Sequence, residues 1–375
     1  MKINSAFDGG NIICQECSGP TNIRLEIRND QDSEFFQWFY FRLSGAKGQD
    51  CALKIINAAA AAYPRGWENY RAVASYDRED WFRVKTDYDG TNLIIRHRPE
   101  RDSVYYAYFA PYSMERHHDL LARALKSPLA ALETLGETLD GQQIDLLTIG
   151  KPEQAKRRIW AIARQHPGET MAEWWIEGFL ERLLDSDDAV ARTVLDKAVF
   201  YTVPNMNPDG SRRGHLRTNA AGTNLNREWQ EPSLEKSPEV YWVRQRMEET
   251  EVDFCLDVHG DEAIPHNFIA GPEGVPSFSK HQGKLLGAYK TGLLQANPDF
   301  QLTHAYPANK RGKANLKIGA NWIAERFGCL AMTLEMPFKD IADGSEQRQG
   351  WSPARSRALG RSNLEAIHAV LDDLR

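Results

Sequence analysis

Two kinds of hydrophobic periodicity follow one another along this chain of 375 residues. Between about residues 22 and 110, apolar and polar residues alternate in short runs separated by Asp, Gly, Asn and Pro. The runs are TNIRLEIRN, QWFYFRLSG, ALKIINA, WFRVKTDY, TNLIIRH and VYYAYFAPY. Such alternation is typical of half-buried strands, because successive side chains of a strand point to opposite faces. The first part of the chain is therefore predicted to form an antiparallel, all-β sandwich of modest size.

The rest of the chain alternates helical and strand patterns, starting at MERHHDLLARALK. Mostly buried strands are predicted for RRIWAIARQ, KAVFYTVPNMN, VDFCLDVHG and CLAMTLEMPF, with helices at TMAEWWIEGFLERLL and SPEVYWVRQRMEET. ETLDGQQIDLLTIG predicts a hairpin with Asp140 and Gly141 at its turn. Buried strands joined by helices are typical of an α/β domain. We expect two domains, an all-β domain at 1–112 and an α/β domain at 113–375.

Composition and charge are those of an ordinary globular protein. Hydrophobic residues make up 42% of the chain and charged residues 26%, and the formal net charge is −6. This balance gives no reason to expect nucleic acid or an anionic membrane as a partner. The N-terminus MKINSAFDGG lacks an apolar signal segment, and no run of about 20 apolar residues occurs. We therefore expect no nucleic-acid or membrane partner and a cytoplasmic location.

The five cysteines are too few and too scattered to form a disulfide framework, and reduced thiols fit a cytosolic protein. Cys14 and Cys17 form the motif CQEC. No second CxxC and no histidine pair follows at the spacing of a zinc ribbon. A pair of half-buried thiols is therefore the preferred interpretation, with a structural metal site as the alternative.

Polar side chains occur where predicted buried strands end. His166 follows one strand and Glu169 opens the next helix, while His259 closes another strand. Sites in open α/β sheets form outside the carboxyl ends of strands. Two imidazoles and one carboxylate are a ligand set of catalytic zinc, which keeps a further position for water. A surface or capping role is the alternative for each residue taken alone.

Two further features add chemistry to this edge of the sheet. Glu335 interrupts the predicted strand MTLEMPF, where a buried carboxylate costs several kcal/mol unless it is paired or functional, so a general base is one interpretation. Residues 206–229 form a long polar loop. There Asn226 and Arg227 could bind a carboxylate, and Arg217 could polarise a carbonyl. An ordinary surface loop is the alternative.

The motifs HPGE, NPDG with LNREW, DVHG and TLEMPF occur in the order found in zinc metallocarboxypeptidases of the pancreatic carboxypeptidase type. The segments QWFYFRL, IINAAAAAYP and VYYAYFAPYS resemble the β-sandwich domain of the cytosolic carboxypeptidase branch, in its bacterial form. The resemblance covers nearly the whole chain. It implies a catalytic domain with a mixed sheet flanked by helices, and one Zn²⁺ per chain. The implied zinc ligands are His166, Glu169 and His259.

The resemblance also implies an activity and the residues that serve it. The activity is hydrolysis of the C-terminal peptide bond of peptides or protein tails, which would be the partners of the chain. Asn226 and Arg227 would anchor the terminal carboxylate, Arg217 would stabilise the oxyanion, and Glu335 would act as general base and acid. Such enzymes usually have an aspartate where this chain has Asn224.

The basic loop has two interpretations, and two functions other than a carboxypeptidase are open. Cytosolic carboxypeptidases remove glutamates from tails, and the loop NKRGKANLKIG offers a basic pocket or, alternatively, a solvated charged surface. Its cations are Lys310, Arg311, Lys313 and Lys317.

Tyr306 is a candidate for the tyrosine that covers the substrate. One alternative function is a zinc amidase or deacylase of the same fold, and the presence of both Asn226 and Arg227 argues against it. The other is a catalytically weak protein that binds peptide tails, and Glu335 argues against it.

Overall fold

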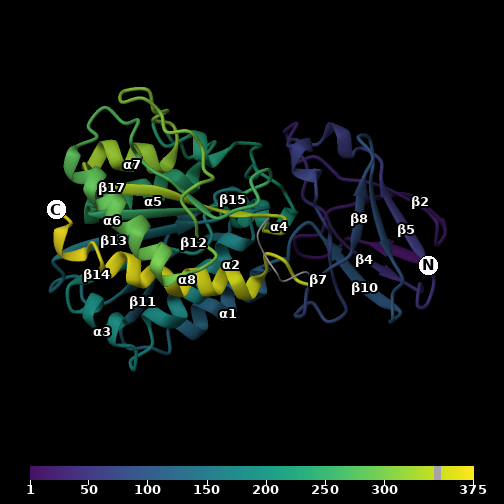
Figure 1. Ribbon diagram of the computed structural model, residues 1–375, viewed down its shortest axis with the longest axis horizontal. Coiled ribbons are helices and arrows are strands. Elements are labelled where there is room, and N and C mark those ends of the chain that lie inside the picture. Colours follow the sequence, from purple (N-terminus) through teal and green to yellow (C-terminus); the bar gives the residue numbers. More distant parts are fainter. Residues whose placement is uncertain (342–347) are drawn as a thin grey trace.

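The computed structural model describes residues 1–341 and 348–375. Two parts lie side by side along the longest axis of the molecule, with the N-terminus at one end and the C-terminus at the other (Figure 1). The smaller part consists mostly of strands. The larger part is a sheet flanked by helices, and the central parallel strands of this sheet point toward the smaller part. The carboxyl ends of these strands therefore lie close to the junction between the two parts.

The smaller part contains two five-stranded sheets. In spatial order, the first sheet comprises β1 (Lys2–Asn4), β4 (Tyr40–Ser44), β10 (Ser103–Ala107), β6 (Val73–Ser75) and β7 (Phe82–Arg83). The second comprises β2 (Ile13–Gly19), β3 (Asn22–Glu26), β5 (Cys51–Ile55), β9 (Leu93–His97) and β8 (Lys85–Tyr88). Side chains such as Phe41 of the first sheet and Leu53 of the second belong to one apolar core. The predicted sandwich of strands is confirmed.

Two details of this sandwich differ from the sequence prediction. The sheets are not wholly antiparallel, because β3 and β5 pair in parallel. The run WFRVKTDY forms two strands, β7 and β8, that belong to different sheets. The break has a physical cause in Arg83, which is buried and turned toward the larger part. Its guanidinium donates hydrogen bonds to the carbonyl oxygens of Phe338 at 2.9 Å and Trp351 at 3.1 Å.

The larger part is built on a mixed sheet, as predicted, and this sheet has seven strands. In spatial order its strands are β11 (Ala130–Glu137), β12 (Gln143–Ile149), β14 (Ala198–Val203), β13 (Arg157–Ala163), β15 (Phe254–Asp261), β17 (Leu330–Pro337) and β16 (Phe268–Ala270). The four strands β14, β13, β15 and β17 are parallel, and the other three pair antiparallel. The predicted hairpin joins β11 to β12, with Gly141 at a φ of 75° in its turn.

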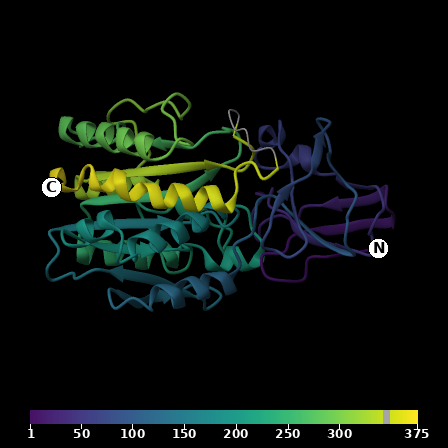
Figure 2. The ribbon, with the colours of Figure 1, turned by 60° about the horizontal axis from the view of Figure 1, so that its bottom comes forward.

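Helices cover both faces of this sheet (Figures 1 and 2). They are α1 (Met114–Ala124), α2 (Met171–Leu183), α3 (Ala189–Leu195), α4 (Pro208–Arg213), α5 (Pro238–Thr250), α6 (Lys280–Ala296), α7 (Gly319–Phe327) and α8 (Pro353–His368). Alternate residues of β13 enter different cores. Ile159 lies in a core with residues of α2, α6 and α8, whereas Trp160 lies in a core with residues of α5 and α7. A strand buried on both faces loses the alternation of apolar and polar residues, as the run RRIWAIARQ shows.

The core on the α2 and α8 side continues into the β-sandwich. At the junction, the ring of Tyr108 stacks on that of Phe338 with centroids 4.5 Å apart. The predicted domain boundary between residues 112 and 113 stays a prediction. In the described ranges, no helix combines the length and apolarity needed to cross a bilayer.

Candidate metal and substrate site

Three buried side chains meet at the carboxyl edge of the mixed sheet. His166 follows β13, Glu169 precedes α2, and His259 lies near the end of β15. The Nδ1 atoms of the two histidines are 3.2 Å apart. Glu169 places Oε1 at 2.6 Å from the Nδ1 of His166 and Oε2 at 2.8 Å from that of His259. Within residues 1–341 and 348–375, this is the only group of three or more side chains suited to a metal ion.

The other nitrogen of each imidazole has its own acceptor. His166 Nε2 lies 3.1 Å from Asn224 Oδ1, and His259 Nε2 lies 2.9 Å from Asp257 Oδ1. An Nε2–H bond to an oxygen leaves the lone pair of Nδ1 free to face the centre. Two nitrogens bound to one tetrahedral zinc at about 2.0–2.1 Å lie roughly 3.4 Å apart, close to the separation observed here. The residues present therefore fit a zinc ion.

The charges of two of these three groups, His166 and Glu169, suit a metal ion. Burial lowers the pKa of His166 to about 4, and the nearby positive charge of Arg217 acts in the same direction. Burial opposes ionisation of Glu169, but the two imidazoles outweigh it and hold the pKa of Glu169 well below its usual value. Burial opposes protonation of His259, but Asp257 and Glu169 raise its pKa well above the usual value. A neutral imidazole and an ionised carboxylate are the forms that bind metal ions, so His166 and Glu169 are already in these forms, whereas His259 must release a proton when a metal binds.

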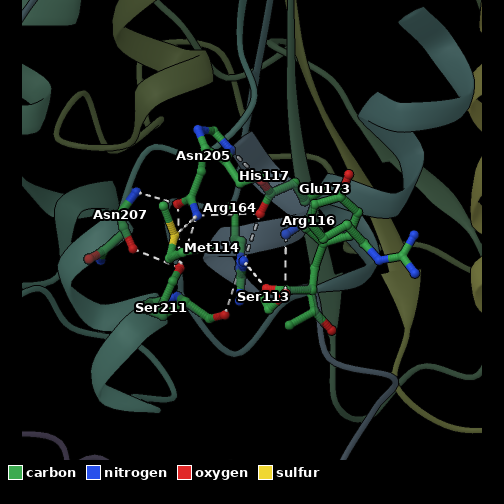
Figure 3. Close-up of polar contacts among 12 residues, drawn as sticks. Ser113, Met114, Arg116, His117, Arg164, Glu173, Asn205, Asn207 and Ser211 are labelled. Carbon is green, nitrogen blue, oxygen red and sulfur yellow. Dashed lines mark hydrogen bonds and ion pairs between the residues drawn. The ribbon is translucent and has the colours of Figure 1, made fainter. Parts of the chain in front are cut away.

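The turn between β13 and α2 is held by Arg164, whose φ of 60° is unusual for a residue with a side chain. Its Nε donates to the carbonyl oxygen of Pro167 at 2.9 Å, inside the turn that carries His166. Its Nη1 donates to the carbonyl oxygen of Tyr112 at 2.8 Å and to Glu173 Oε2 at 2.6 Å (Figure 3). A buried guanidinium with this many partners fixes the path of the turn.

Glu173 connects this turn to a second buried base, His117 of α1 (Figure 3). Its Oε1 lies 2.6 Å from His117 Nδ1, and Asp145 Oδ2 lies 3.3 Å from His117 Nε2. Asn205 donates to Glu173 Oε2 at 3.3 Å. Burial alone would lower the pKa of His117, but Asp145 and Glu173 raise it to about 9. A chain of charged groups therefore lies behind the metal-binding turn.

Glu335 stands beside His259, because β15 and β17 pair these two residues. Its side chain is buried, and its Oε2 has no hydrogen-bond partner among the described residues. Burial raises the pKa of Glu335 well above its usual value, and the negative charges of Glu169 and Asp261 add to this effect, while His259 opposes it. An unpartnered buried carboxylate is costly in free energy, so the structure supports a functional role for Glu335.

The segment 206–229 is not one loop as predicted, because it contains α4 and a short 3-10 helix at Leu225–Arg227. It brings the three remaining predicted residues to the same place. The guanidinium carbon of Arg217 lies 5.6 Å from the ring centroids of both Phe35 and Tyr63, which belong to the β-sandwich. Asn226 Nδ2 lies 3.4 Å from His259 Nε2, and Asn226 Oδ1 accepts a hydrogen bond from the backbone of Gly319. Arg227 is the exposed neighbour of Asn226.

All seven predicted site residues line one cavity of about 540 Å³. Sequence reasoning missed other residues of its wall: Tyr63, Glu262, Glu273, Lys290 and Thr333. Tyr63 lies in IINAAAAAYP and Thr333 in TLEMPF, but neither motif marked these two side chains as part of a site. Glu262, Glu273 and Lys290 lie outside all the quoted motifs. Asp257 was also missed, although its spacing of two from His259 on a strand places both side chains on one face.

The four cations of the basic loop do not line this cavity, although Asn309 and Ile318 of the same segment do. Lys310, Arg311, Lys313 and Lys317 are exposed, and Arg311 donates to the carbonyl oxygen of Pro276 instead. These four cations therefore match the solvated-surface alternative.

Tyr306 does line the cavity, and its ring meets Phe268 edge to face at 4.8 Å. Its hydroxyl donates a short hydrogen bond to Asp261. Cys14 and Cys17 are free thiols on β2, the first exposed and the second half-buried.

A mixed α/β sheet that carries two histidines, one glutamate and a further buried carboxylate at its carboxyl edge is the arrangement of a zinc metallohydrolase. Comparison with known families gives the same class and narrows it. The model described as "Cytosolic carboxypeptidase N-terminal domain" matches residues 3–109, and the zinc carboxypeptidase model matches residues 117–351. The chain belongs to the zinc carboxypeptidase family. It is a metallocarboxypeptidase with one zinc ion.

The similar proteins include bacterial and animal ones. An uncharacterised protein of Zymomonas mobilis is 54% identical over 100% of this chain and 97% of its own length. The structure of a metallo-carboxypeptidase from Pseudomonas aeruginosa, in complex with (2-guanidinoethylmercapto)succinic acid, is 45% identical with a TM-score of 0.97 and covers 100% of both chains. Cytosolic carboxypeptidase 1 of Xenopus laevis is 29% identical over 72% of this chain. The match spans only 26% of that longer protein.

Proposed function

We propose that this chain hydrolyses the C-terminal peptide bond of peptides or protein tails, with His166, Glu169 and His259 as the zinc ligands. The observation that carries the proposal is the buried, unpartnered carboxylate of Glu335 beside these three residues, in a cavity that also holds Arg217, Asn226 and Arg227. A metal site, a base and groups for binding anions thus share one cavity.

Glu335 has the position and the proton affinity of a general base. Zinc supplies Lewis-acid activation of water and of the substrate carbonyl. Glu335 takes a proton from the attacking water through its free Oε2 and returns it to the departing amine, so its carboxylate is regenerated in each cycle. Its raised pKa increases its affinity for the proton. One hydroxyl group is added to the new carboxylate and one hydrogen to the amine of the released residue.

The remaining three residues position the substrate. The Arg217 guanidinium stabilises the negative charge that develops on the carbonyl oxygen. Asn226 and Arg227 bind the terminal carboxylate of the substrate, since an amide and a guanidinium both donate to carboxylate oxygens. This clamp requires a free carboxylate one residue beyond the scissile bond. We therefore propose release of single C-terminal residues and no internal cleavage.

Mass spectrometry of a peptide set tests this proposal. The zinc-loaded protein is incubated with peptides that differ only in the last residue, and each is paired with its C-terminal amide. Loss of one residue from the free acids alone is the expected result. Equal cleavage of the amides, or internal cleavage, would contradict the clamp. Hydrolysis of acylated amino acids, without cleavage of any peptide, would favour the amidase or deacylase function.

We propose a preference for acidic C-terminal residues. The support for this preference is Lys290, because the four cations of the basic loop do not line the cavity. Lys290 is half-buried on α6 and lines the cavity, where an ammonium can pair with a substrate carboxylate. Glu273 lines the same cavity and would favour basic residues instead. The ligand named for the Pseudomonas aeruginosa relative bears both a guanidinium and two carboxylates, so both charges belong in the peptide set.

A pair of variants tests whether Lys290 causes the preference for acidic residues. Lys290→Met removes the charge and keeps the length of the side chain, while Lys313→Ala removes an exposed cation of the basic loop. The first should reduce the preference for Glu over Leu, and the second should leave it unchanged. Fastest release of C-terminal Lys or Arg would reverse the proposal in favour of Glu273.

We propose the cytoplasm as the place where this chain acts. The support is that all five cysteines are free thiols, two of them on the outer strand β2, and that the animal relatives are named cytosolic.

A further inference from the structure

The loop that carries Arg217 is bound to the N-terminal β-sandwich by the carboxylate of Asp30. Asp30 Oδ1 accepts a hydrogen bond from the backbone N–H of Leu216 at 2.6 Å. Its Oδ2 accepts from the backbone N–H groups of Arg217 at 2.8 Å and Thr218 at 2.9 Å, and from the Thr218 hydroxyl at 3.1 Å. Three successive N–H groups that converge on one anion form a concave binding site for it.

This contact is buried on both sides. Only 2% of the surface of Asp30 is exposed, and 1% of that of Thr218. A buried carboxylate without hydrogen bonds is costly, and so is a buried N–H group without an acceptor. The position of Asp30 and the backbone path of residues 216–218 are therefore tied to each other.

Neighbouring contacts hold the same loop to the same domain. The backbone N–H of Gln31 donates to His215 Nε2 at 3.1 Å, and His215 Nδ1 donates to the carbonyl oxygen of Thr218 at 2.9 Å. Asn11 donates to the carbonyl oxygen of Gly214 at 2.8 Å. The two contacts of His215 require the same tautomer, with the proton on Nδ1. The loop is thus fastened on both sides of Arg217.

The side chain of Arg217 also contacts the N-terminal domain. Its guanidinium carbon lies 5.6 Å from the ring centroids of Phe35 and Tyr63, within the range of a cation–π interaction. Tyr63 lines the cavity as well. The N-terminal domain therefore contacts both the main chain and the guanidinium of this residue.

We propose that Asp30 is a positioning residue for Arg217 and that the N-terminal domain is, through it, a working part of the active site. This inference rests on the proposed function, in which Arg217 stabilises charge on the substrate carbonyl oxygen. Asp30 fixes the backbone from which the guanidinium extends before substrate arrives. A donor that is already in position lowers the barrier of the chemical step more than it improves binding of the ground state.

A double-mutant cycle with the full-length, zinc-loaded protein tests the proposal. Asp30→Asn keeps the size of the side chain but points an amide donor at a backbone donor. We expect kcat to fall about 10-fold to 100-fold while KM changes less than about 3-fold, since outright loss of an oxyanion donor costs about 10²–10³ in kcat. In the Arg217→Ala background, Asp30→Asn should lower kcat no further. Asp50→Asn is the matched control, because Asp50 is an exposed carboxylate of the same domain.

An equal loss of kcat from Asp30→Asn in both backgrounds would overturn the proposal, because Asp30 would then act on the fold at large. If Asp30→Asn does not fold, Phe35→Leu takes its place in the cycle. It removes a ring from the guanidinium and keeps an apolar side chain. A loss of kcat confined to the background with Arg217 supports the proposal. No loss, or the same loss in both backgrounds, contradicts it.

Hydrogen exchange separates failure of this inference from failure of the proposed function. The amides of residues 216–218 should exchange faster in Asp30→Asn than in Asp50→Asn, and this measurement needs no substrate. Unchanged exchange would overturn the inference even in an active enzyme. If the wild-type protein releases no C-terminal residue from any peptide, the proposed function is contradicted. The exchange measurement would then still test whether Asp30 holds the backbone of residues 216–218.

Discussion

The Nδ1 atoms of His166 and His259 lie 3.2 Å apart although 93 residues separate the two histidines in the sequence. Pairing of parallel strands brings them together, because β13 and β15 are neighbours and Ala163 is paired with Val258. A local turn then adds Glu169. The candidate zinc site thus depends on a strand pairing and on a turn, and each can be perturbed separately.

Replacing a zinc ligand should lower the zinc content. His166→Ala removes one of three protein ligands, so we expect clearly less than one zinc per chain by elemental analysis after dialysis against a weak chelator. His368→Ala, which changes an exposed histidine of α8, should retain the wild-type content. Full zinc occupancy in His166→Ala would show that the ligand is another residue.

Glu335→Gln should separate binding from catalysis. The amide keeps the shape of the side chain but cannot carry the proton, so we expect kcat to fall about 10²-fold or more while zinc content stays unchanged. Peptide turnover and elemental analysis measure the two effects. Glu153→Gln changes an exposed glutamate and serves as the control. Near-normal turnover in Glu335→Gln would assign the base elsewhere.

Arg164→Gly and Arg164→Ala distinguish the backbone of this residue from its side chain. Both lose the contacts to Pro167 and Glu173, so both should bind zinc about 10-fold more weakly in competition with a chelator. Only alanine keeps the penalty of a positive φ, so Arg164→Ala should be less stable than Arg164→Gly by about 1 kcal/mol. Wild-type zinc affinity in both variants would show that the guanidinium does not hold the turn.

Stability should fall at alkaline pH because of His117. Burial opposes its protonation, but Asp145 and Glu173 raise its pKa from 6.5 to about 9. The folded state therefore binds this proton more tightly than the unfolded state. Its contribution, up to about 3 kcal/mol, is complete below about pH 6.5 and is lost as the pH rises through about 9. Urea unfolding at about pH 6 and about pH 10 should show a smaller difference for His117→Gln than for the exposed control His118→Gln.

Removal of the N-terminal domain should leave an insoluble or unstable protein. A fragment of residues 115–375 would expose Phe338, which now stacks on Tyr108, and would free the carbonyl oxygens that Arg83 binds. Soluble yield and thermal unfolding, compared with the full-length chain expressed in parallel, measure this effect. A soluble and fully active fragment would contradict the interface described above.

Much of the fold could be predicted because its signals are local. The strands β13, β14, β15 and β17 each form an apolar run of sufficient length, and glycine at position 141 permits the positive φ of the hairpin turn. The parallel pairing of β3 with β5 could not be predicted, since pairing partners are chosen by packing over the whole sandwich. The same applies to the division of WFRVKTDY between two sheets.

The chemistry of the site could be predicted from residue types alone: two histidines and a glutamate near strand ends, a carboxylate within an apolar strand, and arginines in a polar segment. Residue type and short spacing carry that information. Which cations reach the cavity became known only from the folded structure, in which Lys290 of α6 lines the cavity and Lys313 does not. The folded structure alone joined Asp30 to Arg217 across 187 residues of sequence. Such contacts depend on how whole domains pack, because burial gains free energy only when surfaces distant in sequence meet.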